Sequence, residues 1–477
     1  MNSYLLNRAL GSIDPRSFQT AQHTRLLHAL QPAPDVSFSP ASIGGGRGGG
    51  GEHDTASDAP TTASLAHATG VNTIAIDKFE GRYLLSGGAD SSIAIWDLEA
   101  ATANEDRALT HRPLGYASRT STAHNFGITH LSFYPFDSLA FLSSSYDHSL
   151  KIYSSETLTA SASFDLASVV FSHALSPVAS HLLVACATQH PAVRLVDLRS
   201  GSSTHSLAGH AGAVLTVSWH PQREHLLASG ATDGTVRLWD IRRSASALGA
   251  LDMDDSVGVT GHDGIGTGAR GRQRGRAHAG AVNGILWTDD ARHLISAGHD
   301  ERVRVWATST GANTLANFGP ALKNEHLSTL LPVLAPSSLT APRTEILFYP
   351  NPREVLMYEA LDGALLKRLR APGGGGGATA SRVTLAAGAG RRNVRNRTTS
   401  LAWRAHDVEL YSAHADGAIR CWRPRTREDA VVDEEDGAER GGGVGEEAER
   451  KRKRRELDEI VRGLAEKRVT FGGGGGR

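Results

Sequence analysis

The hydrophobic positions of this chain recur in short runs with strand spacing rather than helical spacing. Residues 214–219 and 282–287 alternate between apolar and small or polar side chains, and each run is followed by a polar turn. A second apolar run then ends in small residues, and a tight turn such as Thr232-Asp233-Gly234 leads to a third run. Alternation of this kind with Asp-Gly turns is typical of antiparallel β-hairpins. The pattern therefore predicts a repeated antiparallel sheet.

A polar signature repeats in register with these strands. In four places a Ser is followed four positions later by an Asp and six positions after that by a Trp, and a His stands 28 or 29 residues before three of these Trp. A fifth copy, Ser143, Asp147 and Tyr153 with His124 ahead of it, has Tyr instead of Trp. Joined in one buried network, these side chains would fix the strands of a unit, because buried polar groups need partners. The Trp-containing copies are His67, Ser86, Asp90 and Trp96; His210, Ser229, Asp233 and Trp239; His278, Ser296, Asp300 and Trp306; and Ser412, Asp416 and Trp422.

Units of this kind repeated along a chain form a ring of four-stranded blades. We therefore expect an all-β protein, a seven-bladed WD-repeat β-propeller over residues 64–425. Residues 1–30 should form a short N-terminal helical arm, residues 31–63 a Gly-, Ser- and Pro-rich linker, and residues 426–477 a charged low-complexity tail that is disordered or helical. The seven third strands should end near Trp96, Tyr153, Val196, Trp239, Trp306, Tyr358 and Trp422.

The linker ahead of the first blade contains a candidate strand for closing the ring. Residues 35–42 include Val36 and Phe38 in alternation with serines. An open sheet edge promotes aggregation, so the last blade of a propeller needs a strand from the other end of the chain. We expect this segment to pair with the third strand that contains Trp422.

Composition limits the classes of function. Lys and Arg total 50 and Asp and Glu total 50, so the formal net charge is zero and no general attraction to nucleic acid or membranes is expected. Cys186 and Cys421 are the only cysteines, which excludes a disulfide framework and a cysteine-based zinc module. The sequence has neither a transmembrane helix nor an export signal, which favours a soluble intracellular protein.

The repeated His, Ser and Asp do not indicate catalysis, because an enzyme needs one site and these sets recur. The chain has no Gly-x-Ser-x-Gly, His-Glu-x-x-His or Gly-x-x-x-x-Gly-Lys-Ser/Thr motif. Its 22 His include no pair with ligand spacing beside carboxylates, and its glycine runs lack the strand-to-helix setting of a phosphate loop. We expect no catalysis, no cofactor and no metal site.

Two consecutive repeats carry an Arg two positions after an Asp at the end of the third strand. These pairs are Asp197 with Arg199 and Asp240 with Arg242. An Arg just past the strand lies at one rim of the ring, where its planar guanidinium can make two bonds to an acidic or carbonyl group of a partner. The alternative is a salt bridge from each Arg to the Asp of its own or the next blade.

The C-terminal tail contains an uninterrupted basic run. Six such residues exceed what pairing with the preceding glutamates requires, so the run indicates nuclear import. Nonspecific contact with nucleic acid and a simply solvated face remain alternatives. The run consists of Arg450, Lys451, Arg452, Lys453, Arg454 and Arg455.

Several stretches outside the repeated signature resemble one family of WD-repeat proteins. They are spread over most of residues 1–425, and they include the arm around Asp14, Ala21, Thr24 and Arg25. Further stretches are residues 72–76 (NTIAI), 80–88 (EGRYLLSGG), 143–147 (SSSYD), 237–243 (RLWDIRR) and 311–315 (GANTL). On these residues the chain resembles the Cockayne syndrome group A family.

The resemblance implies a nuclear, non-catalytic substrate receptor of a cullin-4 RING ubiquitin ligase in transcription-coupled nucleotide excision repair. In that family the arm and the two Trp-Asp-x-Arg motifs dock on the ligase's damage-binding adaptor. The opposite face of the ring engages the Cockayne syndrome group B-type ATPase and the stalled RNA polymerase II complex. The matching positions here are Asp14, Arg25, Asp197, Arg199, Asp240 and Arg242, although Val196 replaces the first motif's Trp.

Two other classes compete with this interpretation. Another WD-repeat scaffold, such as a chromatin or histone-binding adaptor, would share the propeller but not the Arg199 and Arg242 pair or the arm. An enzyme is disfavoured because the sequence shows no unique polar constellation. We expect no membrane association and no direct sequence-specific binding of nucleic acid.

Overall fold

A computed structural model gives the fold of this chain. It describes residues 6–7, 9–12, 15–40, 65–103, 109–119, 123–178, 181–243, 247–258, 275–341, 344–371, 382–383, 394–404 and 406–425. The described residues up to Pro424 belong to one compact unit, Met1–Pro424, and Arg425 is the first residue of a second unit. The predicted tail over residues 426–477, with its basic run, lies outside the described residues.

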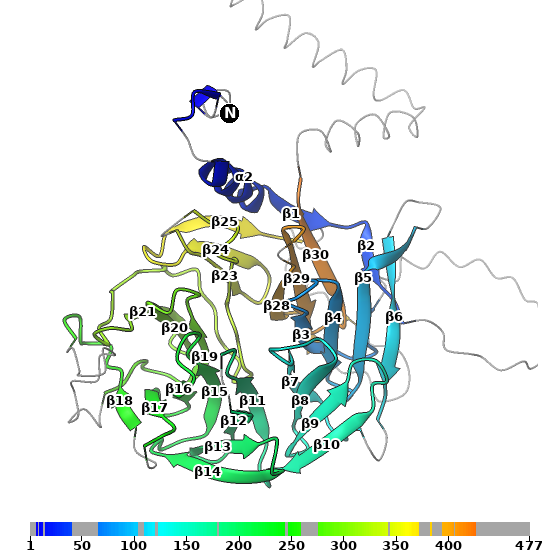
Figure 1. Cartoon of the computed structure of the whole chain (residues 1–477). Helices are drawn as coiled ribbons and strands as arrows, with labels where there is room; N and C mark the ends of the chain where they lie inside the picture. Colours follow the sequence, from blue (N-terminus) through cyan, green and yellow to red (C-terminus); the bar gives the residue numbers. More distant parts are fainter. Residues whose placement is uncertain are drawn as a thin grey trace, which may run out of the picture. The chain divides into compact units, whose positions relative to one another are not determined.

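Seven antiparallel sheets are arranged around a ring (Figure 1), which confirms the predicted seven-bladed propeller. In each sheet the strands follow chain order from the centre outward, except that two short strands from the N-terminal side are added at the outer edges of blades seven and one. Blade one contains β3 (Val71–Ile76), β4 (Tyr83–Gly88), β5 (Ile93–Ala103) and β6 (Leu109–Ala117); blade two contains β7 (Ile128–Phe133), β8 (Ala140–Ser145), β9 (Ser149–Ser154) and β10 (Ala160–Asp165); blade three contains β11 (Val170–Leu175), β12 (Leu183–Thr188), β13 (Ala192–Asp197) and β14 (Ser202–Ala208).

The remaining blades differ in how their outer strand is supplied. Blade five has three strands in the described structure. Residues 312–314 continue its outer edge through the bridge between Trp306 and Asn313 and through backbone hydrogen bonds to Val305 and Ala307. The strands are β15 (Val214–Trp219), β16 (Leu226–Ala231), β17 (Val236–Asp240) and β18 (Ala247–Ala250) in blade four; β19 (Val282–Trp287), β20 (His293–Gly298) and β21 (Arg302–Ala307) in blade five; β22 (Val333–Leu334), β23 (Ile346–Pro350), β24 (Val355–Glu359) and β25 (Leu365–Leu369) in blade six; and β28 (Thr398–Arg404), β29 (Glu409–His414) and β30 (Ile419–Pro424) in blade seven. A separate pair consists of β26 (Arg382–Val383) and β27 (Val394–Arg395).

The hydrophobic core lies between neighbouring blades. One cluster joins Ala185 and Leu195 of blade three to Val214, Trp219 and Trp239 of blade four. The second strands are buried on both faces because each is sandwiched between two blades, as the fully buried β16 illustrates. This explains why the second strands end in small residues, since large side chains on both faces would not fit between blades.

The ring closes with a strand from the N-terminal side, but not with the predicted one. β1 (Leu30–Ala33) pairs antiparallel with β30 and becomes the outer strand of blade seven. The expected segment lies a few residues later, where β2 (Val36–Phe38) pairs in parallel with β6 of blade one. The prediction that residues 35–42 pair with the third strand containing Trp422 was therefore wrong. The closing strand does come from the N-terminal side of the propeller, as expected. Pro32 obscured β1 in the sequence, and an outer edge strand is where Pro is tolerated.

Topology defines two rims of the ring. First and third strands of a blade run in the same direction, so the ends of the third strands and the turns between first and second strands share one side. We call this side the third-strand rim. Helix α2 (Pro15–His28) precedes β1, and Leu30 pairs with Pro424 at the end of β30, so the helix ends on this same rim (Figure 1).

Candidate functional site: the third-strand rim and the polar ladders

The polar signature forms continuous hydrogen-bonded ladders inside the blades. In blade four the indole N–H of Trp239 donates to Ser229 Oγ (2.7 Å), and Ser229 Oγ lies 2.7 Å from His210 Nε2. His210 Nδ1 lies 2.8 Å from Thr235 Oγ1, which donates to Asp233 Oδ1 (2.7 Å). Because Thr235 gives its single proton to Asp233, His210 Nδ1–H must donate to Thr235. Nε2 of the neutral imidazole then accepts from Ser229, so the ladder runs in one direction from indole to carboxylate.

Blade one repeats this arrangement with different side chains. Trp96 donates to Ser86 Oγ (2.8 Å), which lies 2.6 Å from His67 Nε2. His67 Nδ1 lies 2.6 Å from Ser92 Oγ, and Ser92 donates to Asp90. The side chain two positions after the Asp is therefore a member of the ladder. Sequence reasoning missed this position, although Ser92, Ser149 and Thr235 share the spacing.

Blades five and seven contain modified ladders. In blade five His278 Nδ1 lies 2.8 Å directly from Asp300 Oδ1, its Nε2 lies 2.7 Å from Ser296 Oγ, and Trp306 donates to that oxygen at 2.9 Å. In blade seven Trp422 donates to Ser412 Oγ (2.9 Å), and Asp416 accepts from Asn396 and Arg420. The histidine there is His414, which lies 3.0 Å from Ser412 Oγ.

The ladder of blade two is interrupted. His124 Nδ1 lies 2.8 Å from Asp147 Oδ2, as in blade five. Within the described part of the chain, however, Ser143 Oγ and His124 Nε2 are buried without a hydrogen-bond partner. The cause is the replacement of Trp by Tyr153, whose ring instead stacks on Phe141. Ser143 thus keeps its place in the register without the bonds that the other serines make.

The ladders shift the pKa of their acids and imidazoles. Burial alone would raise the pKa of Asp233, but hydrogen bonds from His210, Ala211 N–H and Thr235 hold this pKa well below its usual range. Burial lowers the pKa of His67 to about 4, against a weaker opposing effect of the Asp90 charge. The Asp233 carboxylate is therefore charged and the His67 imidazole neutral at neutral pH, which suits a structural network.

The two Arg positions lie on the third-strand rim in neighbouring blades. Arg242 Nε donates to Asp240 Oδ1 (3.0 Å) and Arg242 Nη2 donates to Asp240 Oδ2 (2.8 Å), while the Arg242 side chain stays 65% exposed. The salt bridge within its own blade therefore exists for Arg242. Arg199 is exposed, and its backbone N–H donates to Asp197 Oδ1 (2.9 Å).

The arm packs on this rim at the junction of blades six and seven. Leu27 and Leu30 are buried in a cluster that includes Phe348 of blade six and Trp422 of blade seven. Lys367 Nζ donates to the carbonyl oxygens of His28 (2.8 Å) and Leu30 (2.7 Å). The other face of the helix points outward, since Arg25 is exposed. Asp14, the other arm residue in the predicted docking set, lies outside the described residues, as does the basic run of residues 450–455.

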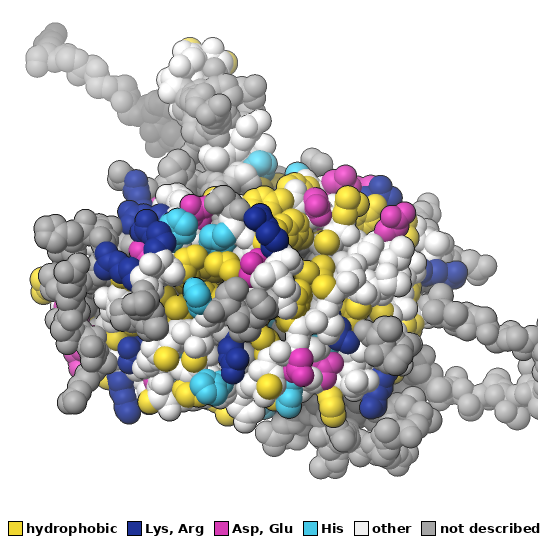
Figure 2. Space-filling model, turned by 60° about the horizontal axis from the view of Figure 1, so that its bottom comes forward, with side chains coloured by type: hydrophobic (Ala, Val, Ile, Leu, Met, Phe, Trp, Pro, Cys, Tyr) yellow, Lys and Arg dark blue, Asp and Glu magenta, His cyan; other side chains and the backbone are white. Residues whose placement is uncertain are grey.

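Exposed apolar side chains occupy the turns between first and second strands on the same rim. Phe79 of blade one is 50% exposed, Phe136 and Leu139 of blade two are 46% and 70% exposed, and Val178 of blade three is 48% exposed. Hydrophobic side chains also lie among basic and acidic ones on the face seen in Figure 2. We call the part of the rim that runs from the arm through these turns to Arg199 and Arg242 the rim arc.

A surface hollow adjoins the arginine end of the rim arc. It has a volume of about 480 Å³ and lies between the turns of blades three and four. Its lining includes Val178, His225, Asp240, Arg242 and Leu248. The rest of its lining is Gln222, Arg223, Glu224 and Leu226, so apolar and charged side chains are mixed around it. A hollow of this kind can accept one protruding polar or charged side chain of a partner.

One further group on this rim was not predicted. Asp290, His293 and Glu345 place three potential metal-ligand atoms within 4.8 Å of one another. The sequence offered only the Asp-x-x-His spacing, because Glu345 comes from the next blade. Among the described residues, no helix is long and apolar enough to cross a membrane.

Comparison with protein families gives four matches to the WD domain, G-beta repeat. They cover residues 60–97, 115–154, 201–240 and 272–307, which contain the third strands of blades one, two, four and five. Blades three, six and seven are not matched, and the first two of these are the blades where the ladder is missing from the sequence. Together with the seven blades, these matches define a WD-repeat β-propeller protein.

Similar proteins of two kinds are found. The chain is 29% identical over 428 residues to WD repeat-containing protein ATCSA-1 of Arabidopsis thaliana, which covers 77% of this chain and 89% of that protein. It is 28% identical over 279 residues to Ribosome biogenesis protein ytm1 of Neurospora crassa, which covers 52% of this chain and 55% of that protein. The Aspergillus niger protein of the same name gives 28% identity over 279 residues, or 52% of this chain and 54% of that protein. The chain thus spans about half the length of the ribosome biogenesis proteins that it matches.

Proposed function

We propose that this WD-repeat propeller is a non-catalytic substrate receptor of a cullin-4 RING ubiquitin ligase that acts in transcription-coupled nucleotide excision repair. The observation that carries the proposal is the rim arc, which combines the arm, the exposed apolar turns and the Arg199 and Arg242 pair on one rim. The match to ATCSA-1 covers 89% of that protein, whereas the match to the Neurospora crassa ytm1 protein covers 55%. This difference supports a repair receptor over a ribosome biogenesis factor.

The chemistry of the rim arc suits a protein partner. Binding hot spots are enriched in aromatic and Arg side chains that lie beside well-packed pockets. Phe79 and Phe136 offer exposed aromatic area, and the hollow beside Arg242 offers a pocket. The Asp240 carboxylate holds the Arg242 guanidinium in one orientation, which lowers the conformational entropy lost on binding.

The arm and the arginines lie at opposite ends of the rim arc. The arm packs on blades six and seven, whereas the Arg pair belongs to blades three and four. A damage-binding adaptor that contacts both would also cover the apolar turns of blades one to three. Two separated contacts on one rigid ring raise affinity through effective concentration.

We assign the opposite rim of the ring to the partners on the substrate side of the ligase. The proposed partners there are the Cockayne syndrome group B-type ATPase and the stalled RNA polymerase II complex. The propeller would hold these beside the ubiquitin-loaded enzyme, while the bond chemistry belongs to other subunits. The proposal includes nuclear residence, with the basic run at residues 450–455 as the import signal.

A pull-down of the full chain from nuclear extract, followed by mass spectrometry, tests this function. Recovery of the damage-binding adaptor together with cullin-4 is the expected result. Recovery of ribosome-assembly factors or histone complexes without cullin-4 would contradict the proposal. It would instead assign the chain to another class of WD-repeat scaffold, which the similarity to the ytm1 proteins keeps open.

A further inference from the structure

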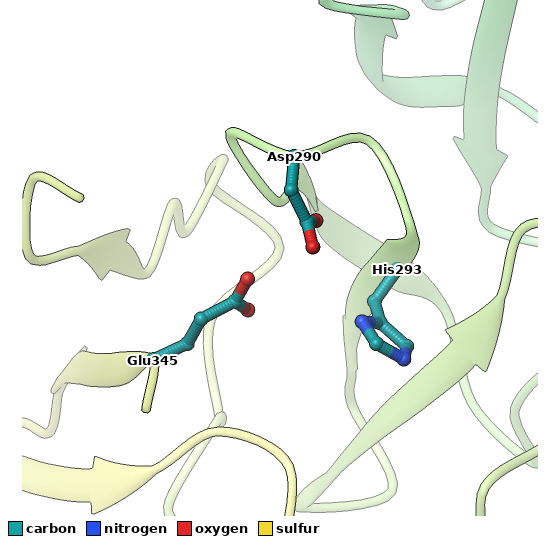
Figure 3. A group of neighbouring side chains, drawn as sticks. All are labelled: Asp290, His293 and Glu345. Atoms are coloured by element: carbon teal, nitrogen blue, oxygen red, sulfur yellow. The ribbon is translucent and has the colours of Figure 1, made fainter. Parts of the chain in front are cut away.

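A mixed group of carboxylates and imidazole joins two blades on the third-strand rim. Asp290 lies in the turn between β19 and β20 of blade five, His293 begins β20, and Glu345 immediately precedes β23 of blade six. Figure 3 shows the Asp290 and Glu345 carboxylates turned toward each other, with one ring nitrogen of His293 on the same side. The three side chains therefore converge from two different blades.

Hydrogen bonds hold Asp290 in position. Its Oδ1 accepts from Thr288 Oγ1 (2.6 Å) and from the Arg292 backbone N–H (2.9 Å). Its Oδ2 is 3.6 Å from Arg292 Nε, and the Arg292 side chain is 72% exposed. One carboxylate oxygen is thus fixed by the turn, and the other is restrained only by a long contact with a solvent-facing guanidinium.

The other two members have buried atoms without partners. Glu345 Oε2 and His293 Nδ1 are both buried and make no hydrogen bond within the part of the chain that the structure describes. Two unsatisfied buried atoms beside crowded negative charge are costly unless a ligand completes them.

We propose that Asp290, His293 and Glu345 bind a divalent transition metal ion of the Zn²⁺ class. Two carboxylate oxygens and one imidazole nitrogen are a donor set that Zn²⁺ accepts with water as the fourth ligand. The imidazole argues against Ca²⁺ and Mg²⁺, which prefer oxygen ligands throughout. Bonds to Zn²⁺ of about 2.0–2.2 Å place neighbouring ligands roughly 3.4 Å apart, so the donors must approach one another by about an ångström.

Such an ion would tie blade five to blade six. The ion would crosslink the first turn of blade five to the start of the second strand of blade six. This inference is independent of adaptor binding, because it concerns the stability of the ring alone.

The test measures Zn²⁺ binding by the metal-stripped full-length protein with calorimetry, together with thermal unfolding. We expect one tight equivalent of Zn²⁺ and a rise in the melting temperature that excess chelator reverses. Glu345→Gln and, separately, Asp290→Asn should weaken this equivalent at least tenfold and abolish the rise. The matched control is Asp137→Asn, because Asp137 caps the equivalent turn of blade two by accepting from Leu139 N–H (3.0 Å).

Both side-chain replacements are nearly isosteric, and Glu345 Oε2 makes no hydrogen bond within the described part of the chain that the change to Gln would remove. Co²⁺ provides a second readout, since its visible absorption reports a low-coordinate site with imidazole and carboxylate ligands. Equal Zn²⁺ binding by the wild type, Glu345→Gln and Asp290→Asn would overturn the proposal and assign the binding to other histidines. Absence of a tight equivalent in the wild type would overturn it as well.

Discussion

Arg242 and Asp240 form a two-bond ion pair at the end of β17, with Nε and Nη2 of the Arg donating to the two oxygens of the carboxylate. Asp240 is buried, whereas the Arg242 side chain is 65% exposed. The same contact that satisfies the aspartate therefore orients an accessible guanidinium beside the surface hollow. Internal pairing and a docking role are compatible for this residue, because an oriented Arg can still present its outer edge to a partner.

The ladders make a sharp prediction about two equivalent serines. Ser229→Ala removes the partner of both Trp239 Nε1 and His210 Nε2, so it should destabilise the protein by roughly 2–4 kcal/mol, since each buried polar group left unpaired costs about 1–3 kcal/mol. Ser143→Ala is the control, because Ser143 Oγ makes no hydrogen bond in the described structure. Urea unfolding should show a lower midpoint only for Ser229→Ala. Equal midpoints for the two variants would refute the energetic role of the ladder.

Stability should decrease as the solution is acidified below about pH 6.5. The pKa of His67 is lowered to about 4 in the folded state, so between about pH 6.5 and pH 4 the unfolded chain binds more protons than the folded chain. Stability therefore rises with pH across this window, by up to about 1.4 kcal/mol per pH unit for one such histidine. The lowered pKa of Asp233 adds a further loss below about pH 4.

Thermal unfolding between pH 4 and pH 8 measures this dependence. His67→Gln should flatten the slope between about pH 4 and pH 6.5. His190→Gln is the control, because His190 is exposed. A melting temperature that is constant across the window, or that increases on acidification, would contradict the buried neutral state of the ladder histidines.

The closing strand predicts different effects for two truncations. Removal of residues 1–33 deletes β1 and exposes the outer edge of β30, so the melting temperature should fall and soluble aggregates should appear. Removal of residues 1–14 leaves α2 and β1 in place and should change neither property. Size-exclusion chromatography and thermal unfolding provide the readouts. Identical behaviour of the two truncations would show that β1 contributes nothing to closure.

The propeller itself could be predicted from the sequence, because the repeats impose it locally. Spacing identified the third strand of every blade, including blades three and six without the full polar signature. The register of closure could not be predicted, since β1 and β2 are short and each is selected by a distant partner strand. The group at Asp290 was equally hidden, because Glu345 meets it only through the contact of two blades.

The basic run predicts the location of the protein. Replacement of residues 450–455 by serine should shift a tagged protein toward the cytoplasm, because the run would no longer bind an import receptor. Adaptor binding in lysate should be unchanged, since the rim arc is intact. Unchanged nuclear accumulation, measured by microscopy, would show that import depends on partners instead.

The central claim is that the rim arc docks the damage-binding adaptor. The most direct measurement is the affinity of purified adaptor for the full chain carrying both Arg199→Ala and Arg242→Ala. Loss of two Arg anchors should weaken binding by more than roughly 30-fold while the melting temperature stays near that of the wild type, because both side chains are exposed. Arg302→Ala is the control, because Arg302 is an exposed residue at the opposite end of a third strand. Wild-type affinity in the double variant, with the fold intact, would contradict the account.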